Sequence, residues 1–429
     1  MNTPRTRGVR VLGNLLWLAL AAGIGAAQTF TTVPFAYNSE ISPVFPTGSM
    51  TMGGIPFSSP TSGFNFWTAN IATGPNPRTL EITTNRYAVS RVYTLISTHW
   101  GQTGGPYAWL EFWGDNGAYH RKDLYGNVDI RDFFQNGRTN DLNGATSVNV
   151  FSGPAVRLDR QRIELPAAFA DQALVRIRLS DNGATDFQRV FLHGLTVESQ
   201  YSAGSMAQLA SAGTWKTTIT LLNPGTTAAA ARLRFFDNIG GPLRLPLTFS
   251  AGAPQVTAQL ERTLQPGAAL LVETTGPDAQ PVDVGWMELN GTGSITGFAV
   301  FRQKIGDTEN EAVVPLESRD PQAFVLWFDN TAGYSTGVAI ANTAPQAATI
   351  GVVIRDDTGR VLLDTSLPLS ARGHTSFSLA TQYAVTAGTR GTVEFRKPPS
   401  GVGPVPQISV LGLRFNPRGS FTTVPAVSR

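Results

Sequence analysis

The sequence predicts an all-β protein made of three antiparallel β-sandwich domains. The composition, with 44 glycines, 28 prolines and only 15% charged residues, favours many short strands joined by turns. The segment "TTITLL" alternates, because Ile219 and Leu221 point to one side while Thr218 and Thr220 point to the other. The C-terminal half also repeats itself. Long helices are not expected, and the best helical candidate, residues 167–174, spans two turns at most.

The internal repeat has a shift of 119 residues. "WKTTITLLNP" (Trp215–Pro224) aligns with "YSTGVAIANT" (Tyr334–Thr343), and "FFDNIGGPL" aligns with "IRDDTGRVL". From Gly267 onward the shift becomes 106, which brings "GWMEL" onto "GTVEF" and predicts a 13-residue loop insertion near residues 250–261 of the first copy. About seven strands in each copy are typical of an immunoglobulin-like sandwich. We therefore predict such domains at residues 201–319 and 320–429.

The pentapeptide "FTTVP" occurs near both ends of the chain. The copy at Phe421–Pro425 aligns with "AVVPL" (Ala312–Leu316) at the end of the first repeat, so it is predicted to be a closing strand. The copy at Phe30–Pro34 lies outside the repeat and is predicted to open the N-terminal domain as an edge strand.

The N-terminal domain, residues 28–200, is predicted to be a larger and more aromatic sandwich with a lead-in rich in Gly, Ser and Pro. "GDNG" (Gly114–Gly117) and "SDNG" (Ser180–Gly183) are predicted hairpin turns. In "ALVRIRLS", the alternation places Val175, Ile177 and Leu179 inward. The predicted strands are "TLEITT", "VSRVYTLISTHWG", "YAWLEFWGDNGAYHRKDL", "VDIRDF", "QRIELP", "ALVRIRLSDNG" and "RVFLHGLTVE".

The series "GGIPF", "FNFWTAN", "RVYTLISTHWGQ", "AWLEFWGDNGAYHRKDL", "VDIRDF" and "RVFLHGLTVES" resembles galactose-binding-like jelly rolls, the fold of many carbohydrate-binding modules. The C-terminal repeats resemble tandem immunoglobulin-like modules of exported bacterial multidomain β-sandwich proteins. The resemblance implies a jelly-roll-like first domain and a binding role, and it supplies no catalytic residue.

Aromatic residues gather in the N-terminal domain and are candidates for stacking on the apolar faces of sugars. Most large aromatics fill cores, but Trp100 and Tyr107 flank the Gly-rich "GQTGGP" loop and are the best candidates for exposure. The predicted glycan-binding residues are Trp100, Tyr107, Trp113 and Tyr119.

Four aspartates in "GDNGAYHRKDLYGNVDIRD" are candidate calcium ligands, because Ca²⁺ takes oxygen ligands from loops. They are Asp115, Asp123, Asp129 and Asp132, and their spacing does not match an EF-hand loop. Solvation of turns and strand edges explains them equally well. A glycoside hydrolase needs two carboxylates across a cleft, and Glu111 with one of these aspartates is the candidate pair.

The first 27 residues have the features of a cleaved signal peptide. Arg5, Arg7 and Arg10 precede the apolar run "VLGNLLWLALAAGI", and small residues end at Ala27. The run is too short and interrupted to favour the alternative, an uncleaved membrane anchor. We expect cleavage near Ala27 and a secreted, extracellular or periplasmic protein without a transmembrane anchor in the mature chain.

Charge and cysteine usage exclude several classes of function. Removing the three leader arginines leaves 30 basic and 30 acidic residues, and a balanced charge argues against nucleic acid as a partner. The absence of cysteine excludes disulfides, thiolate metal sites and a cysteine nucleophile.

The leading hypothesis is a secreted, non-catalytic protein that binds a polysaccharide or cell-surface glycan through the N-terminal domain. The alternative is a structural envelope or matrix protein that meets protein partners through its domains. The third hypothesis is the glycoside hydrolase built on Glu111.

Overall fold

A computed structural model describes residues 29–40, 44–69, 78–182, 189–199, 201–319, 321–397 and 407–429. The chain is 61% strand and 3% helix, so the predicted all-β sandwich class is confirmed. The predicted signal peptide lies outside the described residues. In the part of the chain that is described, no helix has the length and apolar character needed to cross a membrane.

Two packed sheets form the N-terminal part of the molecule. Their inner faces bury alternating apolar side chains such as Leu110, Phe112 and Ile177. One sheet has the order β1 (Thr29–Thr32), β12 (Arg189–Ser199), β6 (Val89–His99), β10 (Arg157–Glu164), β9 (Ser147–Ser152), with β4 (Trp67–Thr68) beside β12. The other has the order β5 (Arg78–Tyr87), β11 (Ala173–Asp181), β7 (Ala108–Gly114), β8 (Tyr119–Leu124). The N-terminal part also contains a hairpin, formed by β2 (Gly48–Met52) and β3 (Ile55–Ser59), and a short helix, η2 (Ala167–Phe169).

The first repeat also consists of two sheets. One has the order β13 (Tyr201–Ser211), β20 (Asp283–Thr292), β15 (Ala229–Asp237), β18 (Gln259–Leu264). The other has the order β17 (Gln255–Thr257), β16 (Leu245–Phe249), β19 (Ala269–Thr274), β14 (Trp215–Leu222), β21 (Thr296–Ile305), β22 (Thr308–Pro315). The insertion predicted as a loop therefore contributes strand residues, because β16 and β17 pair as a hairpin.

The second repeat follows the same plan. One sheet has the order β26 (Val361–Leu369), β25 (Ala348–Asp356), β28 (Arg390–Arg396), β23 (Ala323–Asp329), β31 (Val427–Ser428). The other has the order β27 (His374–Ser378), β24 (Ser335–Asn342), β29 (Ile408–Phe415), β30 (Phe421–Val424). A helical turn, α1 (Leu379–Gln382), and η3 (Ala384–Thr386) follow β27. β15 and β25 have the same bounds once the 119-residue shift is applied.

Both copies of "FTTVP" lie in edge strands, as predicted. The N-terminal copy overlaps β1, which pairs only with β12 at the border of its sheet. The C-terminal copy forms β30, which pairs with β29 as β22 pairs with β21. When β14 and β24 are aligned by the 119-residue shift, the pair Phe415 and Phe421 corresponds to Arg302 and Glu311, so the sequence alignment of Phe421 with Ala312 is off by one residue.

One strand prediction and one hairpin-turn prediction in the N-terminal part are wrong. "VDIRDF" (Val128–Phe133) forms turns and isolated bridges instead of a strand. "SDNG" does not close a hairpin, because β11 and β12 belong to different sheets, and residues 183–188 between them lie outside the described residues. "GDNG" does join paired strands, and Gly117 takes the positive φ of 87° that the turn requires.

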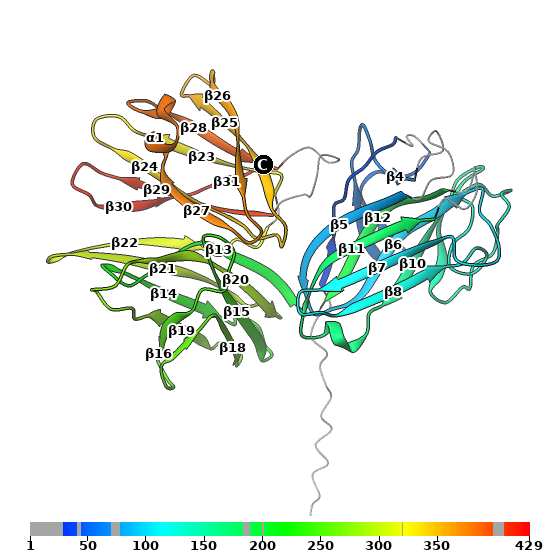
Figure 1. Ribbon diagram of the computed structural model, residues 1–429, viewed down its shortest axis with the longest axis horizontal. Coiled ribbons are helices and arrows are strands. Elements are labelled where there is room, and N and C mark those ends of the chain that lie inside the picture. The colour runs from blue at the N-terminus through cyan, green and yellow to red at the C-terminus, as the bar shows by residue number, and fades with distance from the viewer. Residues whose placement is uncertain are drawn as a thin grey trace, which may run out of the picture.

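Figure 1 shows the N-terminal sheets on one side of the molecule and the two repeats stacked on the other. The repeats are not packed as separate bodies. Leu411 and Phe421 of the second repeat belong to the core of the first, together with Trp215 and Phe301. The stacked repeats therefore bury apolar side chains against each other that neither repeat could bury alone.

Candidate functional site

The outer face of the sheet β5-β11-β7-β8 carries an aromatic surface. Trp109, Glu111 and Trp113 alternate with the core residues of β7, so all three point away from the core. On the edge strand β8, Tyr119 pairs with Trp113 and is half exposed. We call this surface the aromatic face, and define it by Trp109, Glu111, Trp113, Tyr119, Arg121, Arg176 and Arg178.

Polar groups fix the rings of the aromatic face. Glu111 accepts hydrogen bonds from Trp109 Nε1 (3.2 Å) and from the Tyr119 hydroxyl (2.8 Å). The rings of Trp113 and Tyr119 lie 5.5 Å apart between centroids. Because the carboxylate binds both ring systems, the rings are held in one orientation before any ligand arrives.

Arginines lie against both tryptophans. The guanidinium carbon of Arg176 is 3.7 Å from the ring centroid of Trp113, and that of Arg121 is 4.3 Å from the ring of Trp109. Such cation–π contacts are worth about 0.5–1 kcal/mol at exposed sites. A ligand that displaces an arginine from its ring therefore has to replace only this small cation–π energy.

The aromatic face is electrically balanced. Arg178 pairs with Glu81 and lies 3.9 Å from Glu111. Arg121 pairs with Asp123 at 2.7 Å. Three guanidinium groups thus meet three carboxylates, which favours an uncharged ligand rich in hydroxyls over a polyanion or a polycation.

The structure separates the predicted glycan-binding residues. Trp113 and Tyr119 lie together on the aromatic face, and Trp109 joins them. Trp100 directly follows β6 of the other sheet, where it is 44% exposed with the Arg138 guanidinium 4.9 Å from its ring. Tyr107 is buried at 3% exposure in the core, so the expectation that it is exposed is wrong. Thr103, Gly104 and Gly105 of the Gly-rich loop are exposed, but Tyr107 turns into the core just before β7 begins at Ala108.

The four predicted calcium ligands are not brought together. Asp123 pairs with Arg121, and Asp129 with Lys122 at 2.7 Å. Asp132 accepts hydrogen bonds from the N–H groups of Gly101 and Thr139, and Asp115 faces the repeats. Over the described ranges, no three acidic or histidine side chains are grouped so that they could hold a metal ion.

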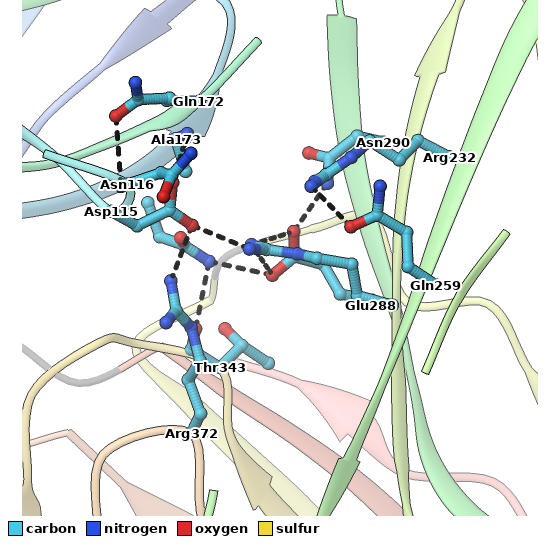
Figure 2. Close-up of polar contacts among 12 residues, drawn as sticks. Asp115, Asn116, Gln172, Ala173, Arg232, Gln259, Glu288, Asn290, Thr343 and Arg372 are labelled. Atoms are coloured by element: carbon cyan, nitrogen blue, oxygen red, sulfur yellow. Dashed lines mark hydrogen bonds and ion pairs between the residues drawn. The ribbon is translucent and has the colours of Figure 1, made fainter. Parts of the chain in front are cut away.

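A buried charge cluster joins the N-terminal part to both repeats (Figure 2). Glu288 on β20 accepts hydrogen bonds from Arg234 Nη2 at 2.9 Å and from Asn85 of β5 at 3.1 Å. Arg234 Nη1 also donates to Asp115 Oδ2 at 2.7 Å, and Arg372 of the second repeat lies 3.4 Å from the same oxygen. Three segments distant in sequence therefore meet around two acids and two arginines, which we call the junction cluster.

Local hydrogen bonds place Asp115 for this role. Gln172 Oε1 accepts from the N–H groups of Asn116 and Ala118, both at 3.0 Å, and so closes the turn between β7 and β8. Asp115 Oδ1 accepts from the N–H of Ala173 at 2.9 Å, which leaves Oδ2 for the arginines. Figure 2 shows Asp115 of this turn above Arg372.

The charges of the junction cluster stabilise one another. Burial alone would raise the pKa of Glu288, but the charges of Arg234 and Arg372 outweigh it and hold the pKa below the ordinary value. The cavity beside the cluster measures about 50 Å³, well below the roughly 300 Å³ of a ligand pocket. The cluster is therefore a structural connection.

The junction cluster was not predicted from the sequence, although a signal for it was present. The alignment of "GWMEL" with "GTVEF" places Glu288 on Glu394, a carboxylate at the same position of two strands that otherwise read as buried. Glu394 is also buried and pairs with Arg355 at 2.9 Å. A repeated acid in a buried strand predicts a charged partner from a neighbouring strand.

A cleft of about 670 Å³ lies beside β1 and reaches Ala203 of β13 and the segment between the two repeats, at Ser318 and Gln322. Its wall is rich in hydroxyl groups, including those of Thr31, Ser58 and Ser59. Among the described residues of its wall, Tyr37 has the one aromatic ring, and it is only 5% exposed. The cleft thus offers no ring face for stacking, in contrast to the aromatic face.

Fold and site together define an all-β sandwich protein with an ordered, partly exposed aromatic sheet face. Comparison with protein-family models, with curated proteins and with solved structures finds no match to this chain.

Proposed function

We propose that this chain is a secreted, non-catalytic binding protein whose aromatic face recognises an uncharged polysaccharide. The observation that carries the proposal is the set of rings on one sheet face: Glu111 binds Trp109 and Tyr119, and the ring of Trp113 packs beside that of Tyr119. Sugars present apolar C–H faces that pack on such rings and hydroxyl groups that hydrogen-bond to guanidinium and carboxylate groups.

The spacing of the rings favours a chain of sugars over a single sugar. Trp109 and Trp113 are four residues apart on β7, which corresponds to about 13 Å along the strand. A ligand that contacts both rings must be an oligosaccharide or longer. The surface is a sheet face, and β8 forms its open edge, so a long polymer can cross it without entering a pocket.

Binding of the full chain to a panel of insoluble and soluble uncharged polysaccharides tests the proposal. Each ring is worth about 1 kcal/mol of packing, so Trp113→Ala and Tyr119→Ala should each weaken binding about fivefold, and together about 30-fold. Trp100→Ala is the matched control, because this exposed tryptophan lies on the other sheet and its loss should leave binding unchanged.

Two results would overturn the proposal. The first is a folded chain that binds no polysaccharide of the panel. The second is binding that survives the double substitution on the aromatic face and is lost with Trp100→Ala. Tyr119→Phe separates the ring from its hydroxyl, because it keeps the stacking surface and removes only the hydrogen bond to Glu111.

A further inference from the structure

One sheet face of the second repeat is buried against the first repeat. This face, the outer side of β27-β24-β29-β30, places Leu411 and Phe421 in the first repeat's core. The ring of Phe421 lies 5.7 Å from that of Trp215. Thr423 Oγ1 donates to the carbonyl of Val313 at 2.5 Å. Figure 1 shows β30 lying along β22 at this contact.

The first repeat has the same face, and there it is uncovered. In strand pairing, Thr220 opposes Phe298, as Ala339 opposes Leu411 in the second repeat. Thr220 and Ala339 are 119 residues apart, so Phe298 is the equivalent of Leu411. By the same register Val313 is the equivalent of Thr423.

Apolar side chains are exposed on this uncovered face. Leu222, Leu271, Phe298 and Val313 are 37–46% exposed, and they occupy neighbouring strands of one sheet. We call this surface the open face and define it by these four residues. Isolated exposed apolar residues are ordinary, but a contiguous set on the equivalent of a buried interface indicates a binding surface.

The surface of the first repeat that receives this face also has an equivalent in the second repeat. In the first repeat, a bulge at Ala207 and Gln208 on β13 is buried against the second repeat, and Gln208 Oε1 lies 3.0 Å from His374 Nε2. The pairing of β23 with β28 places Trp327 at the position of this bulge. Trp327 is 44% exposed, and Val427 on the adjacent β31 is 65% exposed.

We propose that a second copy of this chain docks its open face against Trp327 and Val427 of the second repeat. Within one chain, the second repeat already docks its equivalent of the open face against the β13 bulge of the first repeat. The open face of the first repeat and the Trp327 surface of the second repeat remain exposed. Because the two surfaces differ, the contact is heterologous, and copies can add head to tail without closing a ring.

The contact between copies is weaker than the contact within the chain. Arg302 and Glu311 of the first repeat stand where the second repeat has the paired rings of Phe415 and Phe421. Charged groups at the border of an apolar patch reduce the apolar area that docking removes from water. Assembly is therefore reversible and depends on the chain concentration.

Sedimentation velocity of the full chain over a concentration series, without polysaccharide, tests the proposal. As the concentration rises, the average mass of the wild-type assemblies should exceed that of a dimer. Phe298→Glu blocks the open face and Trp327→Glu blocks the opposite surface, so each variant alone should stay monomeric. An equimolar mixture should form dimers and stop there, because each variant keeps one intact surface.

Matched substitutions separate docking from folding. Val361→Glu changes a 53% exposed valine at the opposite edge of the β23 sheet and should leave assembly unchanged. Val313→Glu and Val427→Glu repeat the two blocks if either first variant fails to fold.

A wild-type chain that stays monomeric overturns the proposal, as does a mixture that stays monomeric. Self-association that survives Trp327→Glu but not Phe298→Glu also overturns it, since the open face would then pair with itself.

Discussion

His374 is the residue whose burial has the clearest consequence. It begins β27 and lies between the repeats, with Nδ1 2.8 Å from Asn238 Oδ1 and Nε2 3.0 Å from Gln208 Oε1. Burial lowers its pKa from the ordinary 6.5 to about 4. The imidazole is thus neutral at neutral pH, and protonating it would place an unpaired charge in the contact between the repeats.

The stability of the repeats should fall with acid because of His374. The unfolded chain takes up the proton near pH 6.5 and the folded chain only near pH 4, so stability is full above pH 6.5 and declines between these values. At pH 5 the loss is about 2 kcal/mol. Urea unfolding of the full chain at pH 7 and pH 5 measures it.

His374→Gln is the comparison that isolates this effect. The variant should lose about 2 kcal/mol less than the wild type between pH 7 and pH 5, whatever its stability at pH 7. The pKa of His99, His120 and His193 is lowered by burial as well, but their effect is common to both proteins and cancels. Equal losses in the two proteins would show that His374 is not buried as the structure has it.

At the scale of elements, the turn between β7 and β8 couples the N-terminal sheets to the repeats. Arg234→Ala should destabilise the chain by about 3–5 kcal/mol, because it leaves Glu288 buried without its partner. Asp115→Ala should destabilise the chain less, since Arg234 would still pair with Glu288. The double variant should reveal a coupling of about 1–3 kcal/mol between the two side chains. Urea unfolding of the four proteins of this cycle gives the value.

An exposed ion pair provides the matched control for this cycle. Arg396→Ala removes a guanidinium that pairs with Asp364, where both side chains are more than 40% exposed. Its effect should stay within about 1 kcal/mol. If Asp115→Ala and Arg234→Ala add without coupling, the turn does not contact β15 in solution.

The elements that sequence patterns predicted are those fixed by local alternation. β15 and β25 follow the 119-residue repeat, and β5, β6, β7 and β8 follow apolar alternation and turn residues. The misses depend on partners distant in sequence. β9 was not predicted, because its strand form depends on pairing with β10. A bulge between Leu174 and Arg176 places Leu174 in the core and leaves Val175, predicted to point inward, only partly buried.

The candidate site was predictable to a similar extent. Trp113 and Tyr119 follow from their places on either side of a hairpin turn, since such strands must pair. The burial of Tyr107 depends on where the loop re-enters the sandwich, which no local pattern specifies. The junction cluster depends on how three segments meet, and only the repeated acid at Glu288 and Glu394 indicated it.

At the scale of the whole molecule, the repeats should lose structure together. Phe421 begins β30 near the end of the second repeat, yet its ring packs against those of Trp215 and Phe301 in the first repeat. The contact crosses about 120–206 residues of sequence, so β30 completes a core whose other residues lie much earlier in the chain. Sharing one core makes two modules more cooperative than tandem domains on a linker.

Phe421→Ala should destabilise both repeats. Truncating a buried Phe costs about 3–5 kcal/mol, and here the cavity opens between the repeats. Hydrogen exchange of the full chain should therefore show faster exchange in β14 and β21 as well as in β29. Phe395→Ala is the matched control, because its ring lies only in the second repeat's own core. It should accelerate exchange in β28 and β25 first, and in β14 less than Phe421→Ala does. Exchange in β14 that stays at the wild-type rate in the Phe421→Ala chain would mean that the first repeat folds without the contact from β30, and that the two repeats are independent modules.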